Sequence, residues 1–169
     1  MIRNFWRNFI FERELDKNLS MKSLDKEFKI KSVAILVDPK LEVEARFFMD
    51  LAADLNLPKV KINLMLLDKT SEIVDELPQT LNLTELNYWS SFKGDLLNFC
   101  QSEYDLLINY YNKSNSIYSL ISTRTKAKMS VGFVGVDSRI NDIIFDFDPK
   151  DKHTFKKELL KYMTILNKI

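Results

Sequence analysis

Residues 32–38 read SVAILVD, and this stretch decides the fold class. Its apolar residues are continuous rather than alternating, which is typical of a strand buried on both faces of a parallel sheet. Asp38 and Pro39 follow at once, as an N-cap and a first helical residue do. Apolar residues at helical spacing then extend from Leu41 to Leu55. The stretch therefore predicts a strand followed by a helix, which is the repeating unit of an α/β protein.

Strand and helix patterns alternate along the rest of the chain. Apolar runs predict further strands at 60–68, 81–89, 105–111, 129–134 and 142–147. Helical spacing predicts helices at 93–102 and 116–126, and a last helix that begins at Asp148 and Pro149. Such alternation favours right-handed crossovers between parallel strands. We expect an α/β fold with a Rossmann-like, doubly wound, mostly parallel sheet of five to six strands in the order 3-2-1-4-5-6.

The bulk composition fits one ordinary domain. The 169 residues are 46% hydrophobic and 29% charged, which is enough apolar material for a core. The net charge of +1 gives no electrostatic case for DNA, and it disfavours RNA. Cys100 is the only cysteine, so a reducing, cytoplasmic setting is expected. No run approaches the roughly 18 apolar residues of a membrane span.

Residues 1–31 differ from the rest, because they carry eight Lys/Arg and five Asp/Glu. Apolar residues at helical spacing predict an amphipathic helix over 2–17, followed by a lead-in to a single domain over 32–169. The helix either docks on a partner or a membrane surface, or packs on its own sheet. The same helix could instead form the contact between copies in a homo-oligomer. The residues expected to face a partner are Arg3, Phe5, Trp6, Arg7 and Phe9.

A ligand crevice is expected where the first strand meets the strand DLLINYY, at the carboxyl ends of both. The turn VDPKLEVE (37–44) has carboxylates and no glycine, so we expect no phosphate there. The turn NYYNKSNSIYS (109–119) offers amides, hydroxyls, a cation and a helix N-terminus. The alternative is an ordinary Ser/Asn helix cap. The candidate ligand-binding residues are Asp38, Asn109, Asn112, Lys113, Ser114, Asn115 and Ser116.

A basic cluster of Arg124, Lys126 and Lys128 opens the segment 122–135, STRTKAKMSVGFVG. We expect these cations in the last turn of a helix, where they favour the negative end of the helix dipole. That turn would lie at the amino edge of the sheet, opposite the expected crevice. A partner protein or an RNA backbone therefore fits the cluster better than a substrate does.

No residue pattern points to a reaction, a metal or a cofactor. His153 is the single histidine and lies far along the chain from Cys100, which falls on an inward helical face. No Cys/His spacing resembles a zinc site. We therefore assign no catalytic residue, no metal ligand and no cofactor.

The segments KSVAILVD, LTELNYWSSFKGDLLNF, YDLLINYY and STRTKAKMSVGF resemble an uncharacterised family of short Bacteroidota proteins, known as a domain of unknown function. That resemblance implies a Rossmann-like fold and no particular activity. KAKMSVGF is also similar to a segment in the N-terminal half of heptosyltransferase-like glycosyltransferases. Those enzymes have a glycine-containing first loop and a second nucleotide-sugar domain, whereas this chain has VDPKLEVE and no room for a second domain.

Three functions remain open. The first is a non-catalytic interaction or scaffold module that contacts a protein partner through the N-terminal helix and the 124–128 cluster. The second is a small-molecule binding protein or reduced enzyme, with an anionic or nucleotide-like ligand between Asp38 and the 109–116 turn. The third is an RNA- or ribosome-associated factor, which would show a steep dependence on salt.

Overall fold

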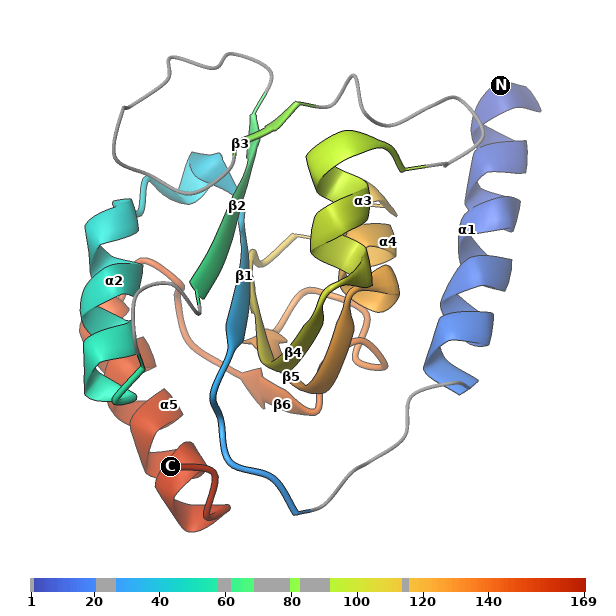
Figure 1. The fold of residues 1–169 in the computed structure, drawn as a ribbon. Coiled ribbons are helices and arrows are strands. Elements are labelled where there is room, and N and C mark those ends of the chain that lie inside the picture. The colour runs from blue at the N-terminus through green and yellow to red at the C-terminus, as the bar shows by residue number, and fades with distance from the viewer. Residues whose placement is uncertain (1, 21–26, 58–61, 69–79, 83–91, 114–115) are drawn as a thin grey trace.

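The computed structural model describes residues 2–20, 27–57, 62–68, 80–82, 92–113 and 116–169 (Figure 1). Within these ranges the strands form one parallel sheet in the order β3-β2-β1-β4-β5-β6. Four strands make its body: β1 (Val33–Val37), β2 (Ile62–Asp68), β4 (Glu103–Tyr110) and β5 (Lys126–Phe133). Two strands of three residues pair at its edges: β3 (Thr80–Asn82) and β6 (Ile143–Phe145). The α/β class, the parallel sheet and the strand order are confirmed, and the arrangement is consistent with a Rossmann-like fold.

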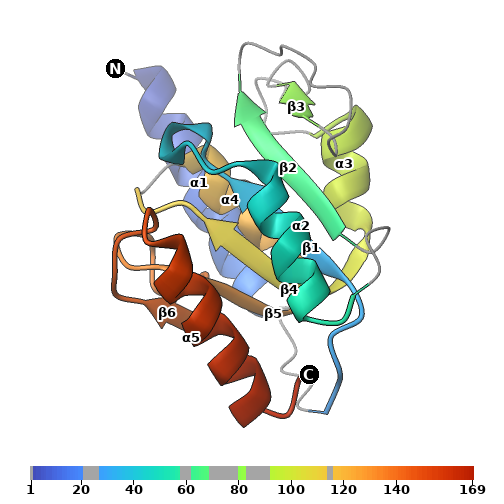
Figure 2. The same cartoon turned by 90° about the vertical axis from the view of Figure 1, so that its left-hand side faces the viewer.

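Helices cover both faces of the sheet (Figures 1 and 2). The 3-10 helix η1 (Pro39–Leu41), α2 (Ala45–Asp54) and α5 (Lys152–Ile165) belong to one side, and α3 (Gly94–Gln101) and α4 (Ser116–Arg124) to the other. α1 (Ile2–Ser20) lies beside α4 and runs antiparallel to the strands. Its C-terminal turn therefore lies at the amino edge of the sheet.

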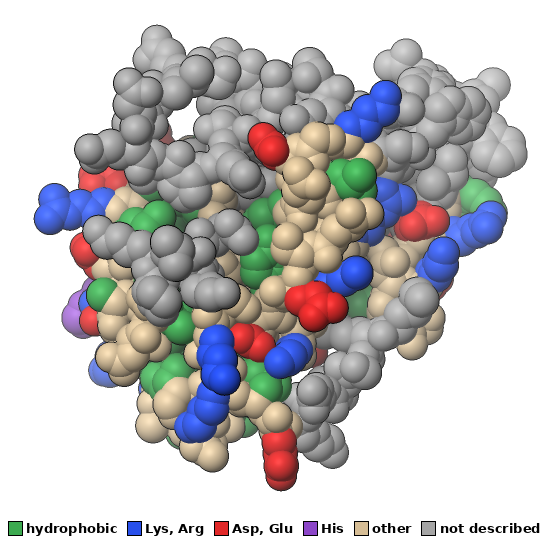
Figure 3. Space-filling model, in the orientation of Figure 1, with side chains coloured by type: hydrophobic (Ala, Val, Ile, Leu, Met, Phe, Trp, Pro, Cys, Tyr) green, Lys and Arg blue, Asp and Glu red, His purple; other side chains and the backbone are tan. Residues whose placement is uncertain are grey.

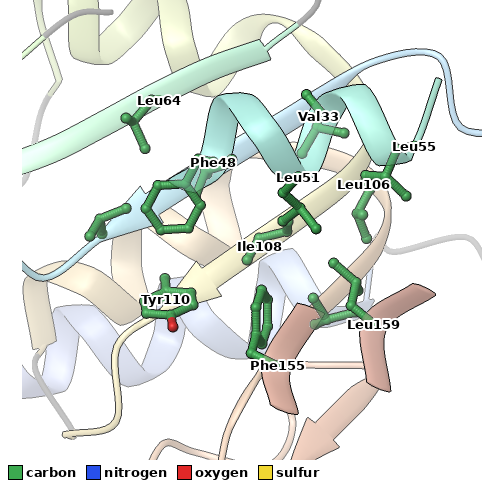
Figure 4. Packing of buried hydrophobic residues seen from close by; sticks show 14 of the residues in the cluster. Val33, Phe48, Leu51, Leu55, Leu64, Leu106, Ile108, Tyr110, Phe155 and Leu159 are labelled. Carbon is green, nitrogen blue, oxygen red and sulfur yellow. The ribbon is translucent and has the colours of Figure 1, made fainter. Parts of the chain in front are cut away.

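The core between the sheet, α2 and α5 is built around aromatic rings (Figure 4). Tyr110 of β4 makes edge-to-face contacts with Phe48 of α2 and Phe155 of α5, at centroid distances of 5.1 and 4.9 Å. Leu106 and Ile108 share this face of β4, while Leu107 and Tyr111 face α3 and α4. The continuous apolar pattern of a central strand thus fills two separate cores.

Helix starts differ from the prediction at two Asp-Pro pairs. Asp38 and Pro39 begin η1 instead of α2, and the left-handed Glu42 (φ 53°) ends that short turn. The last helix begins after Asp151, whose carboxylate accepts a hydrogen bond from Thr154 N (3.0 Å). The Asp148 carboxylate accepts a hydrogen bond from a backbone N–H only two residues later, instead of three. The pair Asp148-Pro149 therefore forms a turn.

Several predicted segment bounds also change. β5 begins at Lys126 instead of 129, so Lys126 and Lys128 lie in a strand and not in a helical turn. α1 continues to Ser20, and β6 holds three of the six residues expected over 142–147. Of the strand expected over 81–89, only the first two residues lie in the described part of the chain, and they belong to β3.

Candidate functional site

The expected crevice at the carboxyl edge is only partly assembled. Val37 pairs with Tyr110, so Asp38, Asn112 and Lys113 lie at the same end of neighbouring strands. The Asp38 carboxylate is buried, and it accepts a hydrogen bond from Lys40 N (3.0 Å) as the cap of η1. Ser114 and Asn115 lie outside the described residues, as does the side chain of Ser116.

Asn109, also a candidate ligand residue, is fully buried within a chain of polar side chains. Its Nδ2 donates to Asn141 Oδ1 (2.7 Å), and its Oδ1 accepts from Ser122 Oγ (2.7 Å). Ser122 Oγ also lies 2.8 Å from the Tyr111 hydroxyl. The Asn109 amide is therefore used inside the protein, which gives it a structural role.

The basic cluster lies at the amino edge of the sheet, as predicted, and it bridges α4 and β5. Arg124 Nη2 forms an ion pair with Glu14 Oε2 of α1 (3.2 Å), and its guanidinium lies 4.6 Å from the centre of the Phe92 ring. Lys128 Nζ forms an ion pair with Asp105 Oδ1 (2.9 Å). Lys126 is exposed at the start of β5.

These three cations line a cavity of about 530 Å³ beneath the C-terminal turn of α1. We call it the α1 cavity. The volume lies within the range of about 300–1,000 Å³ that is typical of small-molecule sites. Its other walls come from four places: Asn18 and Leu19 of α1; Glu103, Tyr104 and Leu107 of β4; Ser122 and Thr123 of α4 with the adjoining Thr125; and Ala127, Ser130 and Ile140 from β5 onward.

One donor in this wall lacks an acceptor. The Nδ2 atom of Asn18 is buried and has no hydrogen-bond partner among the described residues. Leaving such a group unsatisfied costs about 1–3 kcal/mol.

Among the described side chains of α1, three carboxylates form ion pairs with the rest of the domain. Arg139, in the loop between β5 and β6, contacts Asp16 (2.9 Å), Glu12 (3.4 Å) and Asp137 (2.6 Å). The hydrogen bonds from Arg139 hold the pKa of Asp137 below its usual value. Among the described side chains of the helix, Leu15 is fully buried. The ion pairs are exposed, so each contributes little to stability and is weakened by salt.

Of the residues expected to face a partner, Phe9 is 55% exposed. Arg3, Phe5, Trp6 and Arg7 lie in α1, but their side chains are outside the described part of the chain. The acidic residues of α1 that contact Arg124 and Arg139 show that this helix packs on its own domain. That was one of the two alternatives left open by the sequence.

The remaining reactive groups include the buried thiol of Cys100. Burial raises the pKa of the Cys100 thiol to about 12, so the thiol stays protonated at neutral pH. In the described residues, no three His, Cys, Asp or Glu side chains are grouped to hold a metal ion. Within the same ranges, no helix has the length and apolar character needed to cross a membrane.

Comparison with known proteins gives one match. A family model described as a family of unknown function (DUF6913) matches residues 3–166. No curated protein and no solved structure matches the chain.

Proposed function

The chain belongs to this family of unknown function, and we propose that it is a small-molecule binding protein whose negatively charged ligand occupies the α1 cavity. One observation carries the proposal: Arg124, Lys126 and Lys128 line the same cavity. Cations in a concave site favour an anionic ligand.

The ion pairs already formed by two of these cations are compatible with a ligand. Arginine has five N–H donors, so Arg124 can contact Glu14 and a ligand oxygen together. Lys128 has three donors and is 44% exposed, although it contacts Asp105. Lys126 adds an exposed cation at the mouth of the cavity. The ligand would therefore join an existing network of charges.

The predicted site at the carboxyl edge ranks second. It keeps Asn112 and Lys113 near Asp38, but the Asp38 carboxylate caps η1 and Asn109 is used in the buried polar chain. The interaction module ranks next, because it rests on the exposed Phe9, and single exposed apolar residues are common on protein surfaces. The division into residues 1–31 and 32–169 and the cytoplasmic location stay predictions.

An RNA-associated role and glycosyl transfer have less support. Cationic and anionic side chains are interspersed on the face drawn in Figure 3, where a nucleic-acid surface would gather cations. Glycosyl transfer rests on the KAKMSVGF segment alone. In the structure this segment is β5, whose first residues line the α1 cavity.

Two lysine variants test the proposal and separate the two candidate sites. A thermal-shift screen of organic anions with the full chain selects a ligand, and calorimetry then measures its affinity. Lys126→Ala should weaken binding up to about fivefold, because an exposed charged contact contributes up to about 1 kcal/mol. Lys113→Ala removes an exposed cation at the opposite edge and should bind as the wild type does. The reverse result would transfer the site to the carboxyl edge, and no effect of Lys126→Ala would reject the α1 cavity.

A further inference from the structure

We propose that the ligand of the α1 cavity is an amphipathic monoanion, with an apolar body and one carboxylate-like head group. This inference rests on the proposed function, since it assigns a ligand class to the same site. It goes further because it excludes sugar phosphates and nucleotides, which are also anionic.

The first argument is the separation of apolar and charged walls. Tyr104, Leu107 and Ile140 lie deep in the wall and are 4%, 1% and 3% exposed. The charged ends lie toward solvent, since Lys126 is exposed and the Lys128 side chain is 44% exposed. A ligand that follows this gradient has its apolar body inside and its charge at the mouth.

The second argument concerns hydroxyl protons. Each serine or threonine has one O–H to donate, and the hydroxyls in this wall donate to protein acceptors. Thr125 Oγ1 donates to Ile121 O (2.8 Å), Thr123 Oγ1 to Leu120 O (3.2 Å) and Ser122 Oγ to Asn109 Oδ1 (2.7 Å). These hydroxyls have no proton left to donate to a buried sugar, so its oxygens would lack hydrogen bonds from these groups. An apolar body needs no hydrogen-bond partner.

The third argument is the balance of charge. Glu103 lines the same cavity, while Glu14 and Asp105 pair with Arg124 and Lys128. The three cations are therefore matched by three carboxylates in or beside the wall. Each further negative charge on a ligand adds to the repulsion from Glu103, so a phosphate dianion or a polyphosphate is disfavoured relative to a monoanion.

Three probes test the ligand class. Octanoate has the apolar body and the charge, octanamide has the body alone, and glucose 6-phosphate has charge without an apolar body. Calorimetry with the full chain should give octanoate at least about tenfold tighter binding than either of the others. Octanamide binding as tightly as octanoate would overturn the role of the charge. Glucose 6-phosphate binding in place of octanoate would overturn the ligand class and leave the proposed function standing.

The NMR signals of two alanine methyl groups locate the ligand without any substitution in the chain. Ala127 lines the α1 cavity, whereas Ala52 of α2 is buried in the core on the other face of the sheet. In methyl-labelled protein, octanoate should shift the Ala127 resonance and leave Ala52 unchanged. A shift at Ala52 alone, or no shift at saturating octanoate, would overturn the inference. Failure of every anion in the wider screen would instead reject the proposed function.

Discussion

The side chain of Asn141 lies directly over the Cα of Gly132. A Cβ atom at position 132 would lie 2.7 Å from Asn141 Cγ, closer than real contacts allow. Asn141 cannot easily withdraw, because its Oδ1 accepts the hydrogen bond from buried Asn109. The glycine of the segment KAKMSVGF is therefore explained by packing inside the protein, with no need for a ligand.

Gly132→Ala should lower the free energy of unfolding by about 1–3 kcal/mol, as overpacking of a dense core does. Urea denaturation measures the change. The matched background is Asn141→Ala, which removes the obstructing side chain. In that background the same Gly132→Ala change should cost much less, and the difference is the coupling of the two residues. An equal cost in both backgrounds would show that the contact does not limit residue 132.

Arg139→Gln should loosen α1 without unfolding the domain. It removes the contacts with Glu12 and Asp16, which reach this arginine from the helix. Hydrogen exchange should therefore speed up at the amides of α1, while the thermal midpoint of the domain stays nearly constant. Lys161→Gln breaks an exposed ion pair with Glu158 within α5 and is the control. Unchanged exchange in α1 would mean that the ion pairs of Arg139 do not hold the helix in place.

Much of the fold could be predicted because the central strands are apolar throughout. SVAILVD identified β1, and the alternation of strand and helix predicted the parallel order of the sheet. The start of β5 was wrong for a physical reason. Lys126 and Lys128 lie at the amino edge of the sheet, outside the apolar core. The apolar pattern that predicts a strand therefore begins only at Met129.

The candidate site could be predicted only in part. The basic cluster was correctly assigned to the amino edge, but the cavity beside it depends on the placement of α1. The contacts of that helix include ion pairs of Arg139 with Glu12 and Asp16, which lie more than a hundred positions earlier in the chain. Asn109 was interpreted as a ligand residue because it begins the polar turn 109–119 at the expected ligand crevice. Its partners Ser122 and Asn141 come from a helix and a loop that spacing alone cannot place.

Asp105 should make stability depend on pH in the acid range. Burial by itself would raise the pKa of this carboxyl, but hydrogen bonds from Lys128 and from Lys31 N bring it below the ordinary value of 3.8. Because the folded-state pKa is the lower one, the stabilisation is present above about pH 3.8 and is lost as the pH falls through the folded-state pKa.

Urea denaturation across this range should therefore show wild type and Asp105→Asn converging as the pH falls. The control, Asp50→Asn, changes an exposed carboxylate on α2 and should follow the wild-type profile. A difference between wild type and Asp105→Asn that stays constant from neutral pH into acid would assign the effect to packing and not to charge.

Asn18→Leu should raise stability. Leucine fills a similar volume and removes the buried amide donor that has no partner among the described residues. The free energy of unfolding without ligand should rise by about 1 kcal/mol, which urea denaturation measures. Asn98→Leu is the control, because Asn98 is exposed on helix α3 and gains the same helix propensity. Equal stabilisation by both variants would attribute the gain to propensity and not to the removal of the buried donor.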